Sequence, residues 1–255
     1  MPTKENIQQL FDNIAPSYDR LNHIMSFGTD KGWRRKAVRQ IADNPQPLEI
    51  LDVATGTGDF ALAIAKKAHP ESHIVGIDLS EKMLEVGRQK VGERITLQQG
   101  DCEQLSFQDS TFDRVSVAFG IRNFEHLELG FKEMCRVLKP TGKLVILELS
   151  YPDNKFLCWC FKTYALKFLP WIGSKISGNG NAYHYLPDSI LKFPKSNIII
   201  PKLKESGFSR ATVQKFTFGV CLMYIAEKWG LLAVLQKHKH KTRTKIVHCN
   251  HAFTS

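Results

Sequence analysis

The sequence lacks long apolar runs, and it begins with polar residues. Residues 1–13 (MPTKENIQQLFDN) have no apolar segment of the kind found in secretory signals. No stretch approaches the roughly 18 consecutive apolar residues of a membrane helix. We therefore expect a cytoplasmic protein without a spanning helix. Of the 255 residues, 43% are hydrophobic, which is enough for one fully buried core and argues against a disordered chain.

Cysteine is sparse, and its spacing matches no redox or metal motif. The six cysteines are scattered along the chain, and without a secretion signal we expect reduced thiols. Cys158 and Cys160 are separated by one residue, which fits neither a CxxC redox pair nor the usual zinc spacing. We predict no metal site there.

Acidic residues are absent from residues 229–255, which hold five lysine and arginine residues and so half of the net charge of +10. Residues 1–228 are only mildly basic, which argues against nucleic-acid binding by the main body. We expect one domain over residues 1–228 and a flexible basic tail after it. The histidines of the tail follow no ligand spacing, so no metal is expected. A nucleic-acid-binding module built on the tail is the non-enzyme alternative.

Helical and strand patterns alternate over the first 150 residues. Expected helices cover 4–13, 30–42, 59–68, 80–91 and 125–138, and expected strands cover 49–55, 73–79, 95–99, 112–119 and 143–149. The strands are continuous apolar runs, which is typical of a parallel sheet covered on both faces. The pattern predicts a doubly wound α/β fold, which binds ligands at the carboxyl ends of its strands.

A glycine turn follows the first expected strand in LDVATGTGDFA, residues 51–61. Gly56, Thr57 and Gly58 begin a G-x-G-x-x-A pattern, which cradles the pyrophosphate of dinucleotides in other proteins. Asp59 comes next, and its carboxylate would repel a phosphate at the start of the following helix. S-adenosylmethionine carries a sulfonium and an ammonium and no phosphate. The turn therefore favours this cofactor over NAD.

Two further strand ends carry acidic residues that suit the same cofactor. Asp78 ends the second strand and is placed to accept hydrogen bonds from both ribose hydroxyls, a feature shared with NAD sites. Asp101 follows the third strand and is placed to accept from an adenine amino group, with Cys102 packing on the ring. Each residue alone also fits a local role: a helix cap for Asp59, a turn for Asp78 and a loop for Asp101. Together they predict S-adenosylmethionine binding.

Several longer motifs resemble those of the ubiquinone/menaquinone biosynthesis C-methyltransferase family, within the class I S-adenosylmethionine-dependent methyltransferases. The resemblance covers about Phe11 to Lys228. It rests on FDNIAPSYDRLNHIMSFGTDKGWRR (11–35), LDVATGTGD (51–59), GIDLSEKML (76–84), GDCEQLSF (100–107), FDRVSVAFGIRN (112–123), RVLKPTGKLVILELS (136–150) and GSKISGNGNAYHYLPDSI (173–190). The first of these, together with FGIRN, is far more specific than the cofactor motifs such as the glycine turn.

The resemblance implies a fold, a substrate class and a location. It implies a seven-stranded, mostly parallel sheet with one antiparallel edge strand, an N-terminal helical lid (1–45) and an inserted hydrophobic cap (151–195). Members methylate a ring carbon of a prenylated quinol. The chain lacks the extra features of the ubiquinone branch and is more similar to the menaquinone members. Ubiquinone precursors and other small phenols are the alternatives. A homodimer is compatible with the sequence.

The cap also predicts a membrane contact. It is aromatic and apolar with interspersed lysines, and its interface candidates are Trp159, Trp171, Lys162, Lys167 and Lys175. Such a composition suits a helix that lies on a membrane surface. We therefore expect peripheral association with the inner face of the membrane.

The resemblance also implies the catalytic residues. Arg122 and Asn123, in FGIRN after the fourth strand, are expected at the substrate, where Arg122 favours a phenolate and Asn123 binds a ring hydroxyl. Tyr18, in the lid beside Asp19 and Asn22, is expected to reach the substrate hydroxyl. The alternatives are that Arg122 anchors its loop through carbonyl groups and that Tyr18 is a packed lid aromatic.

Two positions depart from the family pattern, and one rival enzyme class is disfavoured. Thr55 stands where members usually carry Gly or Cys, and Ala118 where many carry Ser. A short-chain NAD-dependent reductase would need Tyr-x-x-x-Lys in the helix after the fourth strand, but residues 125–138 contain no tyrosine.

Overall fold

A seven-stranded sheet forms the centre of the molecule, with strand order β3-β2-β1-β4-β5-β7-β6. The computed structural model describes residues 3–19, 26, 28–164, 166 and 180–229. The strands are β1 (Glu49–Val53), β2 (His73–Asp78), β3 (Ile95–Gln99), β4 (Phe112–Ala118), β5 (Leu138–Leu149), β6 (Arg210–Phe216) and β7 (Cys221–Glu227). The longer helices are α1 (Lys4–Ile14), α3 (Thr29–Ile41), α4 (Asp59–Ala65), α5 (Glu81–Arg88), α6 (Leu127–Val137), α7 (Lys155–Thr163), α9 (Gly180–Lys192) and α10 (Ser196–Glu205).

The sheet confirms the predicted doubly wound, mostly parallel architecture but corrects the place of its antiparallel strand. Strands β1 to β5 pair in parallel, whereas β7 pairs antiparallel with both β5 and β6. The expected antiparallel edge strand is therefore wrong in position, because β7 lies inside the sheet and β6 is the edge. Burial follows this order: β7 (CLMYIAE) is almost continuously buried, and β6 (RATVQKF) is largely exposed or half-buried.

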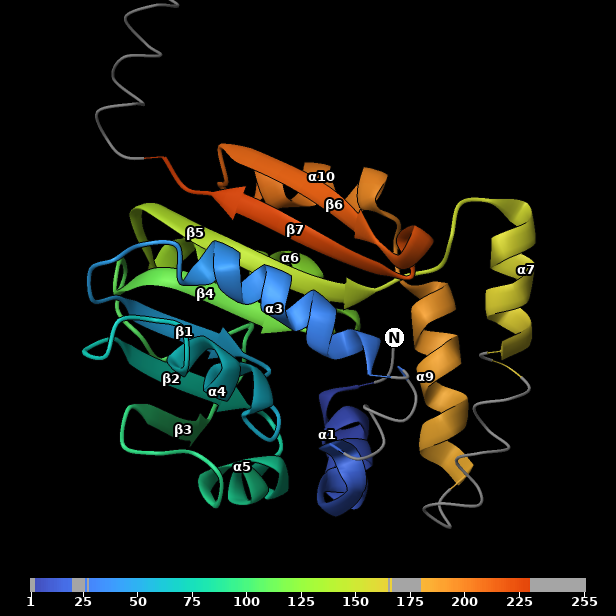
Figure 1. Ribbon diagram of the computed structural model, residues 1–255, viewed down its shortest axis with the longest axis horizontal. Coiled ribbons are helices and arrows are strands. Elements are labelled where there is room, and N and C mark those ends of the chain that lie inside the picture. Colours follow the sequence, from blue (N-terminus) through green and yellow to red (C-terminus); the bar gives the residue numbers. More distant parts are fainter. Residues whose placement is uncertain (1–2, 20–25, 27, 165, 167–179, 230–255) are drawn as a thin grey trace, which may run out of the picture.

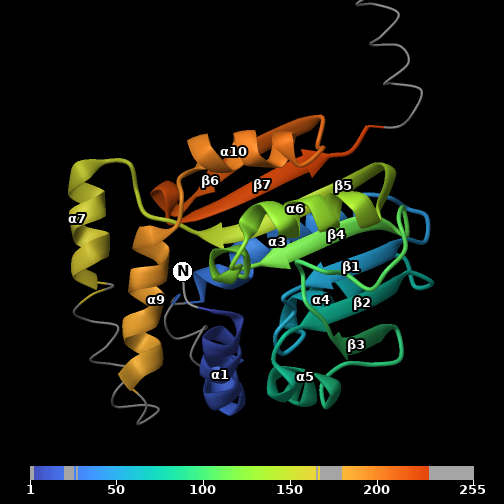
Figure 2. The same cartoon turned by 180° about the vertical axis from the view of Figure 1, so that it is seen from behind.

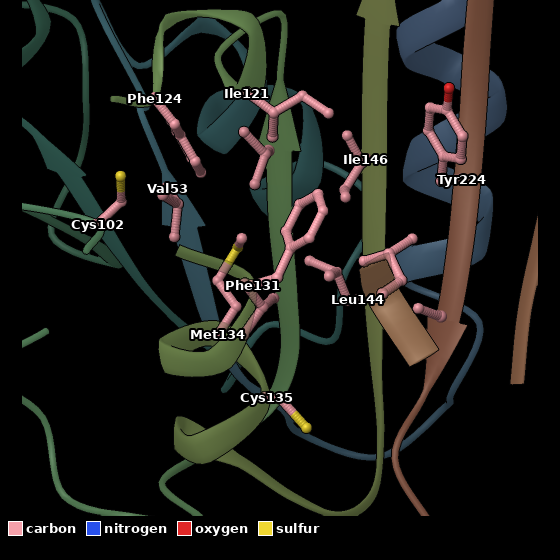
Figure 3. Close-up of a cluster of buried hydrophobic side chains, with 14 of the residues drawn as sticks. Val53, Cys102, Ile121, Phe124, Phe131, Met134, Cys135, Leu144, Ile146 and Tyr224 are labelled. Atoms are coloured by element: carbon pink, nitrogen blue, oxygen red, sulfur yellow. The ribbon is translucent and has the colours of Figure 1, made fainter. Parts of the chain in front are cut away.

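Alternating side chains of the strands fill two cores, one on each face of the sheet. On β5, Leu144 and Ile146 point to the core covered by α6 and α10, and Val145 and Leu147 point to the core under α3 and α4. Figures 1 and 2 show these helix pairs on opposite faces. In Figure 3, Phe131 of α6 lies over the strands beside Leu144. The predicted coverage of both faces is thus confirmed.

The lid and cap helices stand at one end of the sheet. In Figure 1, α1, α9 and α7 lie beyond the carboxyl ends of the parallel strands, where this fold binds its ligands. The short 3-10 helix η1 (Ala15–Ser17) follows α1, and α1 packs against α5. Within the described part of the chain, no helix is long and apolar enough to cross a membrane.

Local capping explains where two of these helices begin. Ser80 was the predicted start of its helix, and its Oγ accepts a hydrogen bond from Met83 N at the start of α5. Asn154 Oδ1 accepts from the backbone N–H groups of Phe156 and Leu157 at the start of α7.

The predictions for Asn22, for Lys167, Trp171 and Lys175, and for the tail from residue 230 onward lie outside the described residues.

Candidate active site

The glycine turn connects β1 to α4 and requires its glycines. Gly56 and Gly58 have φ values of +57° and +77°, in the left-handed region that glycine adopts without a Cβ penalty. Gly58 is the N-cap of α4, and Asp59 is the first residue of that helix. Thr57 between the glycines is buried. The turn therefore has the tight conformation that the sequence predicted.

Asp78 joins the glycine turn to the start of α5. Its Oδ2 accepts from Gly56 N at 2.8 Å and its Oδ1 from Ser80 N at 3.0 Å. Burial raises the pKa of this carboxyl, against the effect of these backbone hydrogen bonds. Each oxygen can accept more than one hydrogen bond, so Asp78 can still accept from a diol in the adjoining cleft.

A cleft of about 690 Å³ opens beside Asp78. It lies between α1 and the ends of the first four strands, and its wall includes Phe11, Tyr18, Gly56, Ile77, Asp78, Met83, Asp101, Cys102, Phe119 and Asn123. The structure thus brings together Gly56, Asp78, Asp101 and Cys102 from the predicted cofactor set. The donor and acceptor chemistry fits S-adenosylmethionine: carboxylates for the ribose and the adenine amino group, and apolar side chains for the adenine ring.

A lysine from α1 reaches the expected adenine end of this cleft. Lys4 Nζ lies 2.6 Å from Asp101 Oδ2 and 3.0 Å from Glu103 Oε2. Although burial lowers the pKa of Lys4, the hydrogen bonds to these two carboxylates raise it above its ordinary value. Asp12 of the same helix accepts from Ser80 Oγ. Helix α1 is therefore held over the cleft by polar contacts that the sequence analysis missed.

The opposite end of the glycine turn forms a smaller cavity of about 310 Å³, lined in part by Asp19, Thr57 and Asp59. Lys90 Nζ lies 2.8 Å from Asp59 Oδ1 and 2.6 Å from Asp19 Oδ2, and Thr57 Oγ1 donates to Asp19. Asp59 thus shares a lysine with a lid carboxylate. The cavity is also lined by Arg34 and Asp52, so three carboxyl groups face two cations at this end. The excess of acidic groups suits the cationic part of the cofactor.

Asp52, at the end of β1, is a site residue that the sequence analysis did not single out. It is 1% exposed and accepts hydrogen bonds from Ser116 Oγ at 2.6 Å and Thr55 Oγ1 at 2.7 Å. Burial raises its pKa to about 6. The unusual Thr55 therefore fits this site as a donor to Asp52. Its position in the sequence, four residues before the first glycine of the turn, is the signal that could have indicated a role at the site.

A second, larger cavity of about 1100 Å³ adjoins the cofactor cleft. Most of its lining is apolar and includes Trp33, Phe119, Leu149, Phe161, Leu186, Ile190 and Val220, joined by Tyr18 and Arg122. Tyr18 and Phe119 line both spaces. Phe161 enters the wall from α7 and Tyr164 from the residue after that helix, and Leu186 and Ile190 enter from α9. Residues 151–195 thus contribute to this cavity.

Arg122 belongs to the 3-10 helix η2 (Ile121–Asn123) and forms a buried ion pair with Glu148 of β5. Its Nη1 donates to Glu148 Oε1 at 2.8 Å and also to the carbonyl of Phe119, and its backbone N donates to Glu148 Oε2 at 3.1 Å. The side chains of Arg122 and Glu148 are 5% and 1% exposed. Arg122 therefore anchors its loop and also lines the apolar cavity. The phenolate role remains a prediction.

Asn123 is oriented by a residue that the sequence analysis also missed. Tyr185 of α9 donates a hydrogen bond from its hydroxyl to Asn123 Oδ1 at 2.8 Å. Burial raises the pKa of Tyr185. The available signal was its place in the family-like stretch NAYHYLPDSI. Glu148 likewise lies in a family-like stretch, VILELS, but the sequence alone predicted no role for it.

Comparison with known proteins identifies the family. The sequence model of the ubiE/COQ5 methyltransferase family matches residues 2–228. The chain belongs to this family. It is 45% identical over 229 residues to the demethylmenaquinone methyltransferase of Bacteroides fragilis, covering 88% of this chain and 93% of that protein. It is also 45% identical to the ubiquinone/menaquinone biosynthesis C-methyltransferase UbiE of Geotalea daltonii, covering 88% and 97%.

Solved structures support the same fold. A methyltransferase from Aquifex aeolicus aligns with a TM-score of 0.56 at 17% identity, over 76% of this chain and 88% of that one. Phosphoethanolamine N-methyltransferase 2 of Haemonchus contortus aligns with a TM-score of 0.58 at 17% identity, over 78% and 53%. Membership of the family makes this ubiE/COQ5 protein an S-adenosylmethionine-dependent methyltransferase, as the glycine turn and the three strand-end carboxylates predicted.

Proposed function

We propose that this methyltransferase transfers a methyl group from S-adenosylmethionine to a ring carbon of a prenylated quinol, and that it converts demethylmenaquinol to menaquinol. The observation that carries the proposal is the apolar cavity of about 1100 Å³ beside the cofactor cleft. Tyr18 and Phe119 line both spaces. An apolar ring with a prenyl chain suits such a lining, and the shared wall supports the binding of the two ligands next to each other.

The chemistry assigns clear tasks to the protein. Bound S-adenosylmethionine supplies an electrophilic methyl group on a sulfonium. The ring carbon forms the new carbon–carbon bond, the sulfur–methyl bond breaks to leave a neutral thioether, and the ring carbon then loses its proton. A ring carbon next to an ionised hydroxyl is the stronger nucleophile. The residues must therefore align the reactants, exclude water and favour the ionised hydroxyl.

The residues around the shared wall match these tasks. Arg122 stays protonated at neutral pH and carries only donors, so it favours a phenolate oxygen. The ion pair with Glu148 holds its guanidinium at the cavity wall. Tyr18 belongs to the lid and lines both spaces, so we expect its hydroxyl to reach a ring hydroxyl of the substrate. Asn123 lines the cofactor cleft and offers an amide to a ring oxygen.

One relative is a demethylmenaquinone methyltransferase and the other a ubiquinone/menaquinone biosynthesis C-methyltransferase, so the quinone branch is part of the proposal. The alternatives are a ubiquinone precursor and another small phenol. Incubation with labelled S-adenosylmethionine and a panel of a prenylated naphthoquinol, a prenylated benzoquinol and simple phenols tests the choice. We expect label in the naphthoquinol. Label mainly in the benzoquinol would move the protein to the ubiquinone branch, and label in neither quinol would refute the proposed function.

We also propose that the enzyme takes its substrate at an anionic membrane surface through α7. Phe156 and Trp159 are 69% and 64% exposed and stack on each other. The helix carries exposed Lys155 and Lys162 and no acidic residue. On its other side, Phe161 lines the apolar cavity. A helix with aromatic side chains on both sides can face the bilayer and the substrate together.

A further inference from the structure

We infer that Tyr185 is a positioning residue that turns the Asn123 carboxamide so that its N–H groups face the substrate oxygen. Helix α9 of the cap brings Tyr185 to η2 at the end of β4. Its hydroxyl donates to Asn123 Oδ1 at 2.8 Å across 62 positions of sequence. The nature of that substrate rests on the proposed function, but the orientation of the amide does not.

The side-chain amide of Asn123 has an acceptor, Oδ1, and a donor, Nδ2, and only Oδ1 makes a hydrogen bond among the described residues. Oδ1 accepts from Tyr185, and the backbone N of Asn123 donates to Gly120 O at 3.0 Å. Within the described ranges, the side-chain Nδ2 makes no hydrogen bond, and half-buried Asn123 lines the cofactor cleft. The free donor end is therefore the one that remains for a ligand.

The chemistry of the neighbouring groups points the same way. Arg122 carries only donors, and it lines the adjoining apolar cavity. An amide N–H and a guanidinium both bind an oxygen that accepts hydrogen bonds. A neutral ring hydroxyl needs an acceptor for its proton, whereas a phenolate oxygen needs donors. Tyr185 thus makes the site selective for the ionised ring, which is the form whose carbon attacks a methyl group.

The charged groups around Arg122 and Asn123 include several carboxylates. Arg122 interacts electrostatically with Glu148, and the two form an ion pair. The cofactor cleft that Asn123 lines also contains Asp78, Asp101, Glu103 and Glu125, of which Asp101 and Glu103 lie against Lys4. A negative ring oxygen beside Arg122 therefore meets a carboxylate that is already paired with a cation.

The test compares Tyr185→Phe with Tyr151→Phe. Both lose only a hydroxyl, but Tyr151 lies against Lys195 outside both cavities, so its variant should keep wild-type activity. We expect Tyr185→Phe to lower kcat about tenfold, the scale of one lost orienting hydrogen bond, with unchanged S-adenosylmethionine affinity. Its acidic limb in the pH–rate profile should move to higher pH. An unchanged kcat and an unchanged profile would overturn the inference.

Substitutions at Asn123 test the direction of the amide. Asn123→Asp keeps the shape but presents oxygen in place of the N–H donors. If donors face the substrate, Asn123→Asp should be less active than Asn123→Ala, because the carboxylate repels a phenolate. If the amide oxygen faces the substrate, Asn123→Asp should be the more active of the two, and the inference fails. Thermal melts of each variant confirm that only folded proteins are compared.

A naphthol probe separates this inference from the proposed function. The absorbance of 1-naphthol, titrated with pH in the presence of protein and S-adenosylhomocysteine, reports ionisation of the bound ring without methyl transfer. We expect the wild type to lower the apparent pKa of bound naphthol and Tyr185→Phe to lower it less. If quinols are not methylated but this difference is found, the proposed substrate is wrong and the positioning role stands. If quinols are methylated and the naphthol pKa is the same in both proteins, the positioning role is wrong.

Discussion

Lys4, in the first turn of α1, lies 2.6 Å from Asp101 in the loop after β3. The contact spans 97 positions of sequence and ties the lid to the expected adenine end of the cofactor cleft. Since α1 also contributes Ile7 and Phe11 to the cleft wall, this helix closes one side of the cleft. The Lys4–Asp101 ion pair therefore joins α1 to the opposite wall.

Replacing Lys4 should loosen the lid. We expect Lys4→Met to increase the rate of S-adenosylmethionine release about threefold to fivefold, because a partly exposed ion pair contributes up to about 1 kcal/mol. Stopped-flow displacement measures this rate. Lys31→Met, at an exposed position in α3, is the control and should behave as wild type. Equal release rates in all three proteins would show that the Lys4–Asp101 ion pair does not slow cofactor release.

Asp78 should decide cofactor affinity. We expect calorimetry to show S-adenosylmethionine binding and no NAD binding, because Asp59 presents a carboxylate at the start of α4, where the pyrophosphate of a dinucleotide would lie. Asp78→Ala should weaken S-adenosylmethionine binding by about 1.5–3 kcal/mol, the scale of hydrogen bonds to a charged group. NAD binding of similar affinity would refute the assignment of the cleft.

Arg122 should act mainly on kcat. We expect Arg122→Ala to keep S-adenosylmethionine affinity and to lower kcat by about two to three orders of magnitude, the cost of removing one preorganised donor. Lysine should restore activity only in part, because it lacks the planar fork of donors. Higher pH should recover some activity in the alanine variant, since more quinol then ionises in solution.

The ion pair with Glu148 calls for a second variant in the Arg122 experiment. Arg122→Ala alone leaves the buried Glu148 carboxylate without its partner, which costs about 3–5 kcal/mol of stability in comparable pairs. Combining Arg122→Ala with Glu148→Gln removes that unpaired charge. A folded double variant with wild-type kcat would show that Arg122 has only a structural role. A folded double variant that lost cofactor binding would favour loop anchoring.

Asp52 should make stability depend on pH in an unusual direction. Its folded pKa of about 6 lies above the ordinary value of 3.8, so the folded state binds the proton more tightly than the unfolded state. Its contribution to stability therefore falls as pH rises from about 4 to 6, by up to about 3 kcal/mol. Asp52→Asn removes this penalty. In urea unfolding, the difference in free energy of unfolding between the variant and the wild type should be larger at pH 7.5 than at pH 5, in favour of the variant. A gain that is equal at both pH values would rule out a raised pKa for Asp52.

Helix α7 should carry the membrane contact. We expect the protein to co-sediment with anionic liposomes at low salt, with an electrostatic part that weakens as salt rises and an aromatic part that does not. Replacing Phe156 and Trp159 by serine should remove the salt-resistant part. Leu129→Ser, at an exposed apolar position of α6, is the control. Absence of co-sedimentation at low salt would refute surface capture.

The sequence by itself determined most of the strands and helices in residues 1–150 and the chemical type of the cofactor site. Continuous apolar strands such as EILDV predicted a sheet covered on both faces, and Ser80 predicted a helix start, because these signals act within a few residues. The glycine turn before Asp59, with Asp78 and Asp101 at later strand ends, predicted the cofactor, because parallel strands bring their carboxyl ends to one edge.

The tertiary structure alone decided which side chains are paired and which are free. Lys4, Lys90, Glu148 and Tyr185 fix the orientation or charge of the predicted site residues, and the sequence gives no local signal for these pairings. The predicted site residues that they contact lie 26 to 97 positions away. The interior place of β7 likewise depends on which neighbouring edges remain to be paired. Such choices depend on burial and hydrogen-bond satisfaction across the whole fold, which become defined only when distant segments meet.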